Sequence, residues 1–226
     1  MSGHAIEIRD LVFRYETGGF KLNIPSLSIR QGEQVAVVGS SGCGKTTLAY
    51  LISGIHVPDA GSVAIGRQRV SEMSDMERRD FRISNIGFIF QEFELIEYLR
   101  VEENILLPYL VNNSLDLGRS ARECARTLAE SVGLGEKLRN FPGELSQGEK
   151  QRLAICRALV ADPKIIVADE PTGNLDARNT EAIMQLIRKQ ACDRGATFVM
   201  ITHEQGLLDR FERMIDLETP GGGGVS

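Results

Sequence analysis

A glycine-rich loop between an apolar run and a helical pattern constrains the fold of this chain most strongly. Residues 39–46 read Gly-Ser-Ser-Gly-Cys-Gly-Lys-Thr and match the pattern G-x-x-x-x-G-K-[ST]. Residues 34–38 before it are apolar at nearly every position, as in a strand covered on both faces, and residues 45–53 show a helical pattern. Average residue usage gives a chance match a probability on the order of one per cent. The loop therefore predicts a strand–loop–helix unit that binds phosphate.

The residue types in this loop suit the phosphates of a nucleotide. Glycine permits a tight loop whose backbone N–H groups turn inward, and the following helix adds about half a positive charge at its N-terminus. We expect Lys45 to reach the β- and γ-phosphates, Thr46 to bind Mg²⁺ and Thr47 to bond the α-phosphate. An ordinary glycine-rich turn is the alternative. The expected nucleotide-binding residues here are Gly39, Ser40, Ser41, Gly42, Cys43, Gly44, Lys45, Thr46 and Thr47.

Two carboxylates follow a second apolar run. Residues 165–168 read Ile-Ile-Val-Ala, and Asp169 and Glu170 come next. Because the carboxyl ends of parallel strands meet at one edge of a sheet, we expect both acids beside the phosphate loop. Asp169 is then placed to hold Mg²⁺ together with Thr46, and Glu170 to orient or deprotonate an attacking water. Taken alone, the pair equally fits a capping carboxylate before Pro171; the phosphate loop favours the catalytic interpretation.

Strand and helix patterns alternate along most of the chain, which indicates an α/β domain. Strands are expected at residues 6–15, 20–29, 34–38, 62–65, 86–90, 165–168 and 197–201, and a helix at 178–192. Residues 92–161 differ, because helical patterns dominate there, at 101–109, 120–132 and 147–161, the last after an expected N-cap at Ser146. We therefore expect an α/β core of residues 1–91 and 162–219, an inserted helical subdomain of residues 92–161, and a disordered tail of residues 220–226.

Composition argues against several classes of protein. The chain has 26 Lys+Arg and 31 Asp+Glu, a net charge of −5, which disfavours a general nucleic-acid-binding protein. Its longest apolar run, residues 48–52, falls far short of the roughly 20 residues that cross a bilayer. Glu7 interrupts the N-terminus early, so we expect no secretory signal and a cytoplasmic protein. Reduced thiols, rather than a zinc site or disulfides, are expected of Cys43, Cys124, Cys156 and Cys192.

Further motifs carry a resemblance to a known family. Residues 145–152 read Leu-Ser-Gln-Gly-Glu-Lys-Gln-Arg and resemble the signature motif of ATP-binding-cassette (ABC) ATPases. Gln91 in Phe-Ile-Phe-Gln resembles the Q-loop of that family, and Pro-Thr-Gly-Asn-Leu-Asp at residues 171–176 resembles its D-loop. His203 after a threonine resembles its switch histidine, and Tyr15 the aromatic residue that stacks on adenine. These motifs stand in the family order over nearly the whole chain.

The resemblance implies a fold, an activity and a self-association. The fold is a P-loop NTPase with a mixed sheet core, an antiparallel β subdomain and a helical subdomain inserted between the Q-loop and the strand that ends in Asp169. The activity is hydrolysis of ATP with Mg²⁺, and two copies enclose two MgATP head to tail. In the family, Ser146 and Gly148 contact the γ-phosphate held by the other copy, which suits N–H groups at a helix N-terminus. A plain capping box closed by Glu149 is the alternative.

The resemblance also gives each motif residue a role. His203 is expected to contact the γ-phosphate, Gln91 to sense Mg²⁺ or water, and Asp176 to lie at the dimer seam. Tyr15 as a core aromatic and Asp176 as a helix cap are the alternatives. The implied catalytic residues are Glu170, His203, Gln91 and Lys45; the implied Mg²⁺ ligands are Thr46, Gln91 and Asp169; nucleotide contacts outside the loop are Tyr15, Ser146, Gly148 and Asp176.

The signature departs from its commonest form, in which Gly-Gly-Gln stands at residues 147–149. This chain has Gln147 and Glu149 there and keeps Ser146 and Gly148. Glu149 places negative charge near ATP, and that cost is partly offset if Glu149 caps its own helix. The resemblance therefore leaves open how tightly two copies close.

Residues 90–108 are similar to the lipoprotein-release, macrolide-export and FtsE-like branch of the family. The implied partner is an integral membrane permease subunit of FtsX/LolC/MacB type, with the cassette peripheral on the cytoplasmic face of the inner membrane, in an export or mechanotransmission complex. The apolar residues of this segment fit a groove for a helix of that partner, or a self-packed subdomain. They are Phe93, Leu95, Leu99 and Leu107.

Two other functions compete with this interpretation. One is a soluble ABC ATPase that acts in DNA repair or translation, which the acidic composition and the single cassette disfavour. The other is a scaffold that binds ATP without hydrolysing it, which the intact set of Lys45, Asp169, Glu170 and His203 disfavours.

Overall fold

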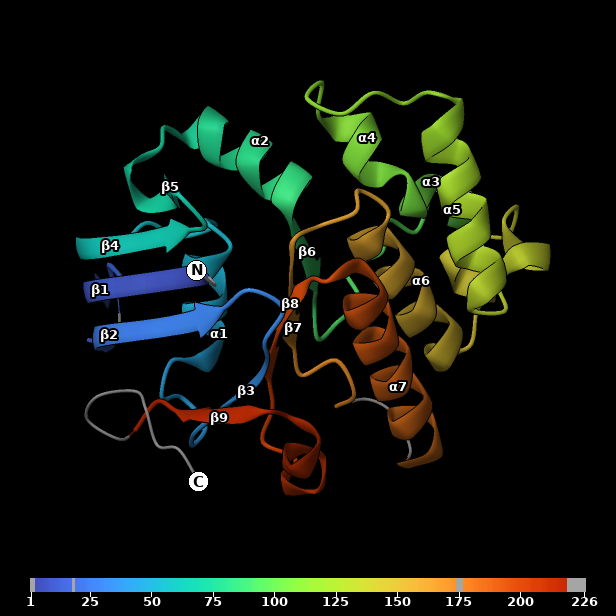
Figure 1. Cartoon of the computed structure of the whole chain (residues 1–226). Helices are drawn as coiled ribbons and strands as arrows, with labels where there is room; N and C mark the ends of the chain where they lie inside the picture. The colour runs from blue at the N-terminus through green and yellow to red at the C-terminus, as the bar shows by residue number, and fades with distance from the viewer. Residues whose placement is uncertain (1–2, 18, 174–176, 219–226) are drawn as a thin grey trace.

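The computed structural model describes residues 3–17, 19–173 and 177–218. Figure 1 shows an antiparallel sheet on one side, a second sheet in the middle and a group of helices on the other side. The predicted tail, residues 220–226, lies outside the described residues. Within the described ranges, no helix combines the length and the apolar character needed to cross a membrane.

The antiparallel sheet has four strands in the order β2-β1-β4-β5. Ile8 of β1 lies opposite Leu27 of β2 on one side and Val63 of β4 on the other, and all three are buried. Buried and exposed residues alternate along β1, so one face of this sheet is buried and the other is exposed. The strands are β1 (His4–Arg14), β2 (Lys21–Arg30), β4 (Ala60–Ile65) and β5 (Gln68–Arg69).

The central sheet has five strands in the order β6-β7-β8-β3-β9, and every neighbouring pair is parallel. Antiparallel pairing is thus confined to one sheet and parallel pairing to the other. Every residue of β7 and β8 is buried, as their unbroken apolar sequences predict for strands covered on both faces. The strands are β3 (Gln34–Val38), β6 (Ile86–Ile89), β7 (Ile165–Asp169), β8 (Thr197–Ile201) and β9 (Arg213–Asp216).

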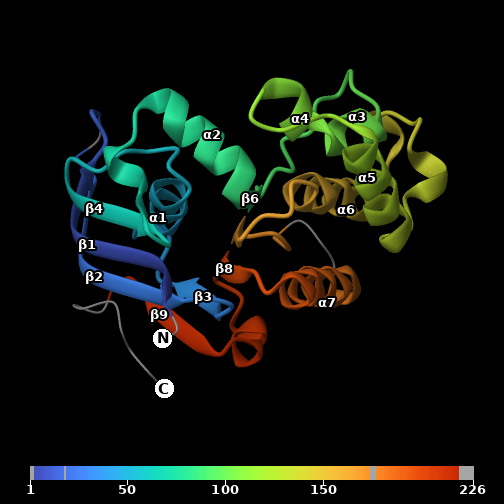
Figure 2. The ribbon, with the colours of Figure 1, turned by 45° about the horizontal axis from the view of Figure 1, so that its top comes forward.

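Successive residues of the central strands face two different cores. Ile165 and Val167 of β7 join a core with the antiparallel sheet, while Ile166 and Ala168 join a core with the helices on the other face. Helix α1 (Lys45–Ile52) lies between the two sheets in Figure 2, and α6 (Gln147–Leu159) and α7 (Ala177–Arg194) cover the opposite face. The strand that carries the two acids is therefore held from both sides.

The helices agree with the predicted ones except at two places. The single helix expected at residues 101–109 is wrong, because two short helices meet at Leu106: Pro108 has no N–H for the carbonyl of Asn104. Helix α2 was not predicted, although Ser74 and Glu77 form a capping box, which is a sequence signal for the start of a helix. The helices are α2 (Asp75–Asn85), α3 (Val101–Ile105), α4 (Leu107–Val111), α5 (Arg119–Ser131), α6 (Gln147–Leu159) and α7 (Ala177–Arg194).

Short 3₁₀ turns connect these elements at Val70–Glu72, Gly135–Lys137, Pro142–Glu144 and Gln205–Arg210. The four cysteines are free thiols. Strand β9, at the edge of the central sheet beside β3, was not predicted, because its four residues alternate too briefly to stand out.

Candidate functional site

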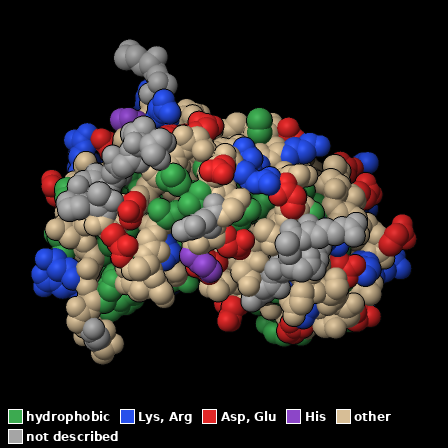
Figure 3. Space-filling model, turned by 90° about the horizontal axis from the view of Figure 1, so that it is seen from below, with side chains coloured by type: hydrophobic (Ala, Val, Ile, Leu, Met, Phe, Trp, Pro, Cys, Tyr) green, Lys and Arg blue, Asp and Glu red, His purple; other side chains and the backbone are tan. Residues whose placement is uncertain are grey.

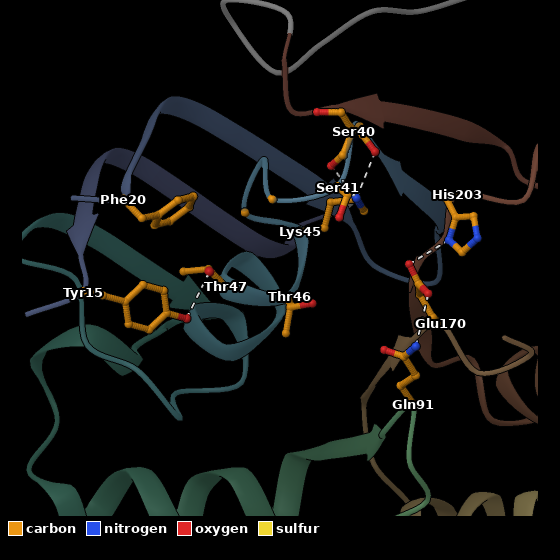
Figure 4. Close-up of a pocket in the computed structure, with 13 residues that line it drawn as sticks. Tyr15, Phe20, Ser40, Ser41, Lys45, Thr46, Thr47, Gln91, Glu170 and His203 are labelled. Carbon is orange, nitrogen blue, oxygen red and sulfur yellow. Dashed lines mark hydrogen bonds and ion pairs between the residues drawn. The ribbon is translucent and has the colours of Figure 1, made fainter. Parts of the chain in front are cut away.

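The carboxyl ends of β3, β7 and β8 meet at one edge of the central sheet and border a cavity of about 830 Å³ (Figure 4). Parallel strands bring the residues that follow them to the same edge, so this arrangement is the one that the apolar runs predict. The lining residues are Tyr15, Phe20, Gly39, Ser40, Ser41, Gly42, Gly44, Lys45, Thr46, Thr47, Gln91, Glu170 and His203.

The phosphate loop wraps around the ammonium group of Lys45. Lys45 Nζ donates to the carbonyl oxygens of Gly39 at 2.9 Å and Ser40 at 2.8 Å. Gly44 precedes α1 with a φ of 105°, and a Cβ there would come within 2.8 Å of Phe20. Only glycine meets both conditions, since an L side chain rarely adopts this φ and has no room here. The loop thus presents a cation and a helix N-terminus to the cavity, which fits the phosphates of a nucleotide.

Asp169 and Thr46 are hydrogen-bonded to each other at this edge of the central sheet. Asp169 is buried at the end of β7, and burial raises the pKa of its carboxyl group, whereas a hydrogen bond from the Thr46 hydroxyl lowers it. No group of three or more His, Cys, Asp or Glu in the described part of the chain is arranged to hold a metal ion. A carboxylate beside a hydroxyl instead fits Mg²⁺, which binds few protein oxygens and completes its shell with water and phosphate.

Glu170 lies between two residues from other elements. Its Oε1 lies 2.8 Å from His203 Nδ1, and its Oε2 accepts a hydrogen bond from Gln91 Nε2 at 3.5 Å. Gln91 follows β6 and His203 follows β8, so three strand ends contribute to one cluster (Figure 4). The φ of Glu170 is 44°, a left-handed conformation that costs a non-glycine residue about 1–2 kcal/mol. A carboxylate is therefore held in a strained conformation facing the phosphate loop.

Two aromatic residues line the far end of the cavity. Tyr15 packs edge-on against Phe13 at 5.0 Å between ring centroids and remains partly exposed. Its hydroxyl lies 3.2 Å from Thr47 Oγ1, so the Thr47 hydroxyl, expected to bond the α-phosphate, is paired with Tyr15 here. Phe20 was missed by the sequence analysis, although an aromatic residue in the same hairpin as Tyr15 was the available signal.

Comparison with known proteins places the chain in a family. Residues 22–173 match the family model described as ABC transporter. The chain belongs to the ABC transporter family. It is 44% identical over 192 residues, 85% of this chain and 84% of the relative, to an uncharacterized ABC transporter ATP-binding protein, MJ1508, of Methanocaldococcus jannaschii.

Two further similarities narrow the kind of ABC protein. The chain is 40% identical over 196 residues to the lipoprotein-releasing system ATP-binding protein LolD of Colwellia psychrerythraea, covering 87% of this chain and 75% of LolD. A dimeric structure of the ATP-binding cassette MJ0796, in a post-hydrolysis state with ADP and Pi, has a TM-score of 0.82 and 32% identity, covering 96% and 95% of the two chains. The chain is an ABC ATPase of the branch that includes LolD, and the predicted fold, ATPase activity, ATP and Mg²⁺ are confirmed.

Four of the predicted ABC residues do not line the cavity, namely Cys43, Asp169, Ser146 and Gly148, and one is not described. Cys43 belongs to the phosphate loop, yet its Sγ lies 2.6 Å from the place where a Cβ on Gly39 would stand, so its side chain packs against Gly39. Ser146 and Gly148 do not line the cavity, and Asp176 falls outside the described residues. The residues that converge in one copy are thus those of the phosphate loop, the carboxylates, Gln91, His203 and the aromatics.

The segment predicted to be the ABC signature lies at the start of α6, which is closed by a capping box. Ser146 Oγ accepts the N–H of Glu149 at 3.4 Å, and Glu149 Oε2 accepts the N–H of Ser146 at 2.9 Å. Lys137 Nζ lies 2.5 Å from Glu149 Oε1. The bonds from Lys137 and from the Ser146 backbone lower the pKa of Glu149 to about 2. The capping box, the alternative that the sequence left open, is present, and it does not exclude phosphate binding at the same helix end.

Proposed function

We propose that this chain hydrolyses MgATP with Glu170 as the residue that holds and deprotonates the attacking water. The observation that carries the proposal is the position of the Glu170 carboxylate, between His203 and Gln91 and in the same cavity as the phosphate loop. A carboxylate in hydrogen-bond reach of a water can act as a general base, and His203 and Gln91 fix the direction of this one.

Each remaining residue has a part in this mechanism. Lys45 and the loop N–H groups bind the β- and γ-phosphates and stabilise the charge that develops on them. His203 orients Glu170 and contacts the γ-phosphate, while Tyr15 and Phe20 border the adenine. Mg²⁺, when bound by Thr46, Gln91 and Asp169, neutralises charge on the phosphate oxygens. Catalysis in this site is mainly positioning and electrostatics.

Two copies are needed to complete the site. In one copy, Ser146 and Gly148 lie at the start of α6 and outside the cavity. We propose that they bind the γ-phosphate held by a second copy, with Asp176 at the seam, because the N-terminus of a helix of 13 residues attracts anions. The dimeric structure of the similar cassette MJ0796 supports this arrangement.

Glu170→Gln tests the catalytic proposal. The variant keeps the shape of residue 170 and one acceptor oxygen but loses the base, so it should bind ATP, hydrolyse it at least about 100-fold more slowly and accumulate as a dimer. Hydrolysis near the wild-type rate would remove Glu170 from this role. Mixing a Ser146→Ala variant with a Lys45→Ala variant tests sharing between copies: one complete site should form, and activity should recover. No recovery on mixing would contradict it.

We also propose a membrane permease as the partner, bound at a second groove. This groove, of about 550 Å³, lies between α2 and β6 on one side and α4 and α6 on the other. Val111 on α4 is 64% exposed, and Arg79 and Arg82 border the apolar lining. An amphipathic helix with acidic residues at its edge matches this mixture. The apolar lining comprises Ile55, Ile83, Ile86, Phe88, Phe90, Leu107, Pro108, Val111, Ala158 and Ala161.

Some residues of the segment 90–108, which resembles the LolD branch, line the groove, and others pack in the interior. Leu107 and Pro108 line the groove, whereas Phe93 is buried and Leu95 packs against the core of the helical region. Both interpretations of residues 90–108 therefore apply to part of it. We propose residues 92–161 as an inserted subdomain that carries this groove wall, and a permease of FtsX/LolC/MacB type at the cytoplasmic face of the inner membrane, in export or mechanotransmission.

The charge distribution agrees with a protein partner. On the face drawn in Figure 3, Lys and Arg side chains are separated by Asp and Glu side chains. Interspersed charges of this kind lack the basic stripe typical of nucleic-acid binding on that face of the described residues. We therefore propose no nucleic-acid partner.

Val111→Glu tests the groove. The change places a charge on the exposed apolar wall, so the cassette should lose its association with the membrane subunit while the ATPase activity of the isolated chain stays unchanged. Met76→Glu is the matched control, because Met76 is 73% exposed on α2 and does not line the groove. Equal binding of the permease by both variants, measured by co-purification from membranes, would refute the groove as its docking site.

A further inference from the structure

The start of α6 carries an ion pair that the hydrolysis mechanism does not use. Lys137 ends the 3₁₀ turn Gly135–Lys137, and its Nζ lies 2.5 Å from Glu149 Oε1. The other oxygen of Glu149 accepts the N–H of Ser146, so both carboxylate oxygens have a partner. The Glu149 side chain is 16% exposed, which makes this pair more enclosed than most surface ion pairs of the chain.

Glu149 has two opposite effects at this helix end. Its carboxylate stabilises the first turn, because it accepts a backbone N–H and interacts favourably with the helix dipole. The same negative charge, three residues after Ser146, opposes any phosphate that approaches the N–H groups there. A neighbouring cation reduces this repulsion without removing the cap. Lys137, with its Nζ 2.5 Å from Glu149 Oε1, lies where a cation reduces this repulsion.

We propose that Lys137 is a positioning residue of the ATP site shared between two copies: by pairing with Glu149 it keeps the start of α6 attractive to the γ-phosphate of ATP bound to the other copy. The inference rests on the proposed sharing of Ser146 and Gly148 between copies. It assigns Lys137 a role through Glu149, with no contact to the nucleotide.

The pair also has a purely structural interpretation, which predicts something different. An ordinary ion pair contributes little to stability, and loss of either member should then matter about equally. If the charge of Glu149 is what Lys137 controls, loss of Lys137 is harmful only while Glu149 remains charged. Removing both charges should restore function even though it does not restore the pair.

A double-mutant cycle in the Glu170→Gln background measures this. The variants are Lys137→Met, Glu149→Gln and both together, and the readouts are the affinity of the monomer for ATP and the protein concentration at which ATP drives dimer formation. Lys137→Met should raise that concentration about tenfold, the effect of one unit charge on an anion across a partly hydrated interface. Glu149→Gln removes the repulsion and should lower that concentration by the same reasoning, whereas the double variant should stay within about twofold of the parent. ATP affinity of the monomer should not change.

Two further variants separate charge from structure. Lys137→Arg keeps the cation and should dimerise like the parent. Arg119→Met removes a cation that is 91% exposed, against 38% for Lys137, and that pairs with Glu123 on α5 at 2.7 Å; it should have no effect. Circular dichroism confirms that each variant is folded.

Two results would overturn the inference. Lys137→Met that dimerises like the parent shows that the charge of Glu149 does not reach the phosphate. A double variant as weak as Lys137→Met shows that the pair acts only on structure. A parent that fails to dimerise with ATP overturns the shared site itself, and this outcome is recognisable because it appears before Lys137 or Glu149 is changed.

Discussion

A buried arginine of α6 holds the segment that follows Gln91. Arg157 is 8% exposed, and its Nη2 donates to the carbonyl oxygen of Phe93 at 2.6 Å while its Nη1 donates to that of Glu94. Phe93 and Glu94 have φ values of 58° and 50°, so two successive non-glycine residues adopt the left-handed conformation. Burial lowers the pKa of Arg157 to about 10, which leaves it protonated at neutral pH. We expect Arg157 to be what keeps this conformation in place.

The size of the effect follows from the two bonds. Hydrogen bonds from a charged donor contribute about 1.5–3 kcal/mol each when buried, and less when partly exposed. Arg157→Met keeps an apolar stem of similar volume but removes both bonds, so the free energy of unfolding should fall by about 3 kcal/mol. With an m value of about 3 kcal/mol/M in urea for a chain of this size, the unfolding midpoint should fall by about 1 M.

Urea denaturation followed by circular dichroism measures the change. Arg126→Met is the matched control, since Arg126 is 59% exposed and pairs only with Glu102, at 3.3 Å, among the ion pairs of the described residues. Its loss should cost below about 1 kcal/mol. Equal midpoints for Arg157→Met and Arg126→Met would refute the reasoning, because they would show that the Phe93 and Glu94 carbonyls do not depend on the guanidinium. Arg157→Lys, with a single compact donor, should fall between the two.

Three further predictions concern the site. Lys45→Ala removes the ammonium that bonds Gly39 and Ser40, so ATP should bind on the order of 100-fold more weakly by calorimetry, and an unchanged Kd would refute the phosphate assignment. Glu218 accepts a hydrogen bond from the Ser40 hydroxyl at 2.5 Å; Glu218→Gln removes its negative charge and should tighten ATP binding a few-fold, whereas weaker binding would contradict this. The low pKa of Glu149, about 2 against an ordinary 4.5, predicts that wild type is more stable than Glu149→Gln at pH 7; the difference should vanish as pH falls from 4.5 to 2, and a constant difference would be incompatible with it.

The parts that could be predicted from sequence are those set by local chemistry. The phosphate loop needs glycine, lysine and threonine at fixed spacing, so its place between β3 and α1 was readable. Strands β7 and β8 were readable because burial on both faces requires unbroken apolar residues. Once these strands are parallel, the acids and His203 must reach one edge. The sequence was therefore sufficient to predict that these residues lie close together at the site.

The parts that could not be predicted depend on partners far away in the chain or on weak patterns. Arg157 and Phe93 are 64 residues apart, and no periodicity links a helix residue to the carbonyl of a loop. Helix α2 has no buried residue, so it lacks the apolar stripe by which helices are recognised. Phe20 lies between two strands, where an aromatic residue has no characteristic spacing. For Arg157 and Phe20, tertiary packing and not local preference decides the position, whereas for α2 the capping box was the one local signal.

The sequence predicts where Glu170 lies along the chain, but the direction of its carboxylate is set by tertiary contacts. Its N–H donates to the carbonyl of Ile201 at 3.0 Å, so pairing with β8 continues one residue past the end of β7. The chain then turns with a φ of 44°, and this turn directs the carboxylate toward His203 and Gln91, which lie 33 and 79 residues away. Strain of about 1–2 kcal/mol persists only where surrounding contacts hold it. Because those contacts exist within one copy, the carboxylate is already directed before a second copy arrives, and in the proposed shared site the second copy has only to add the donors of α6.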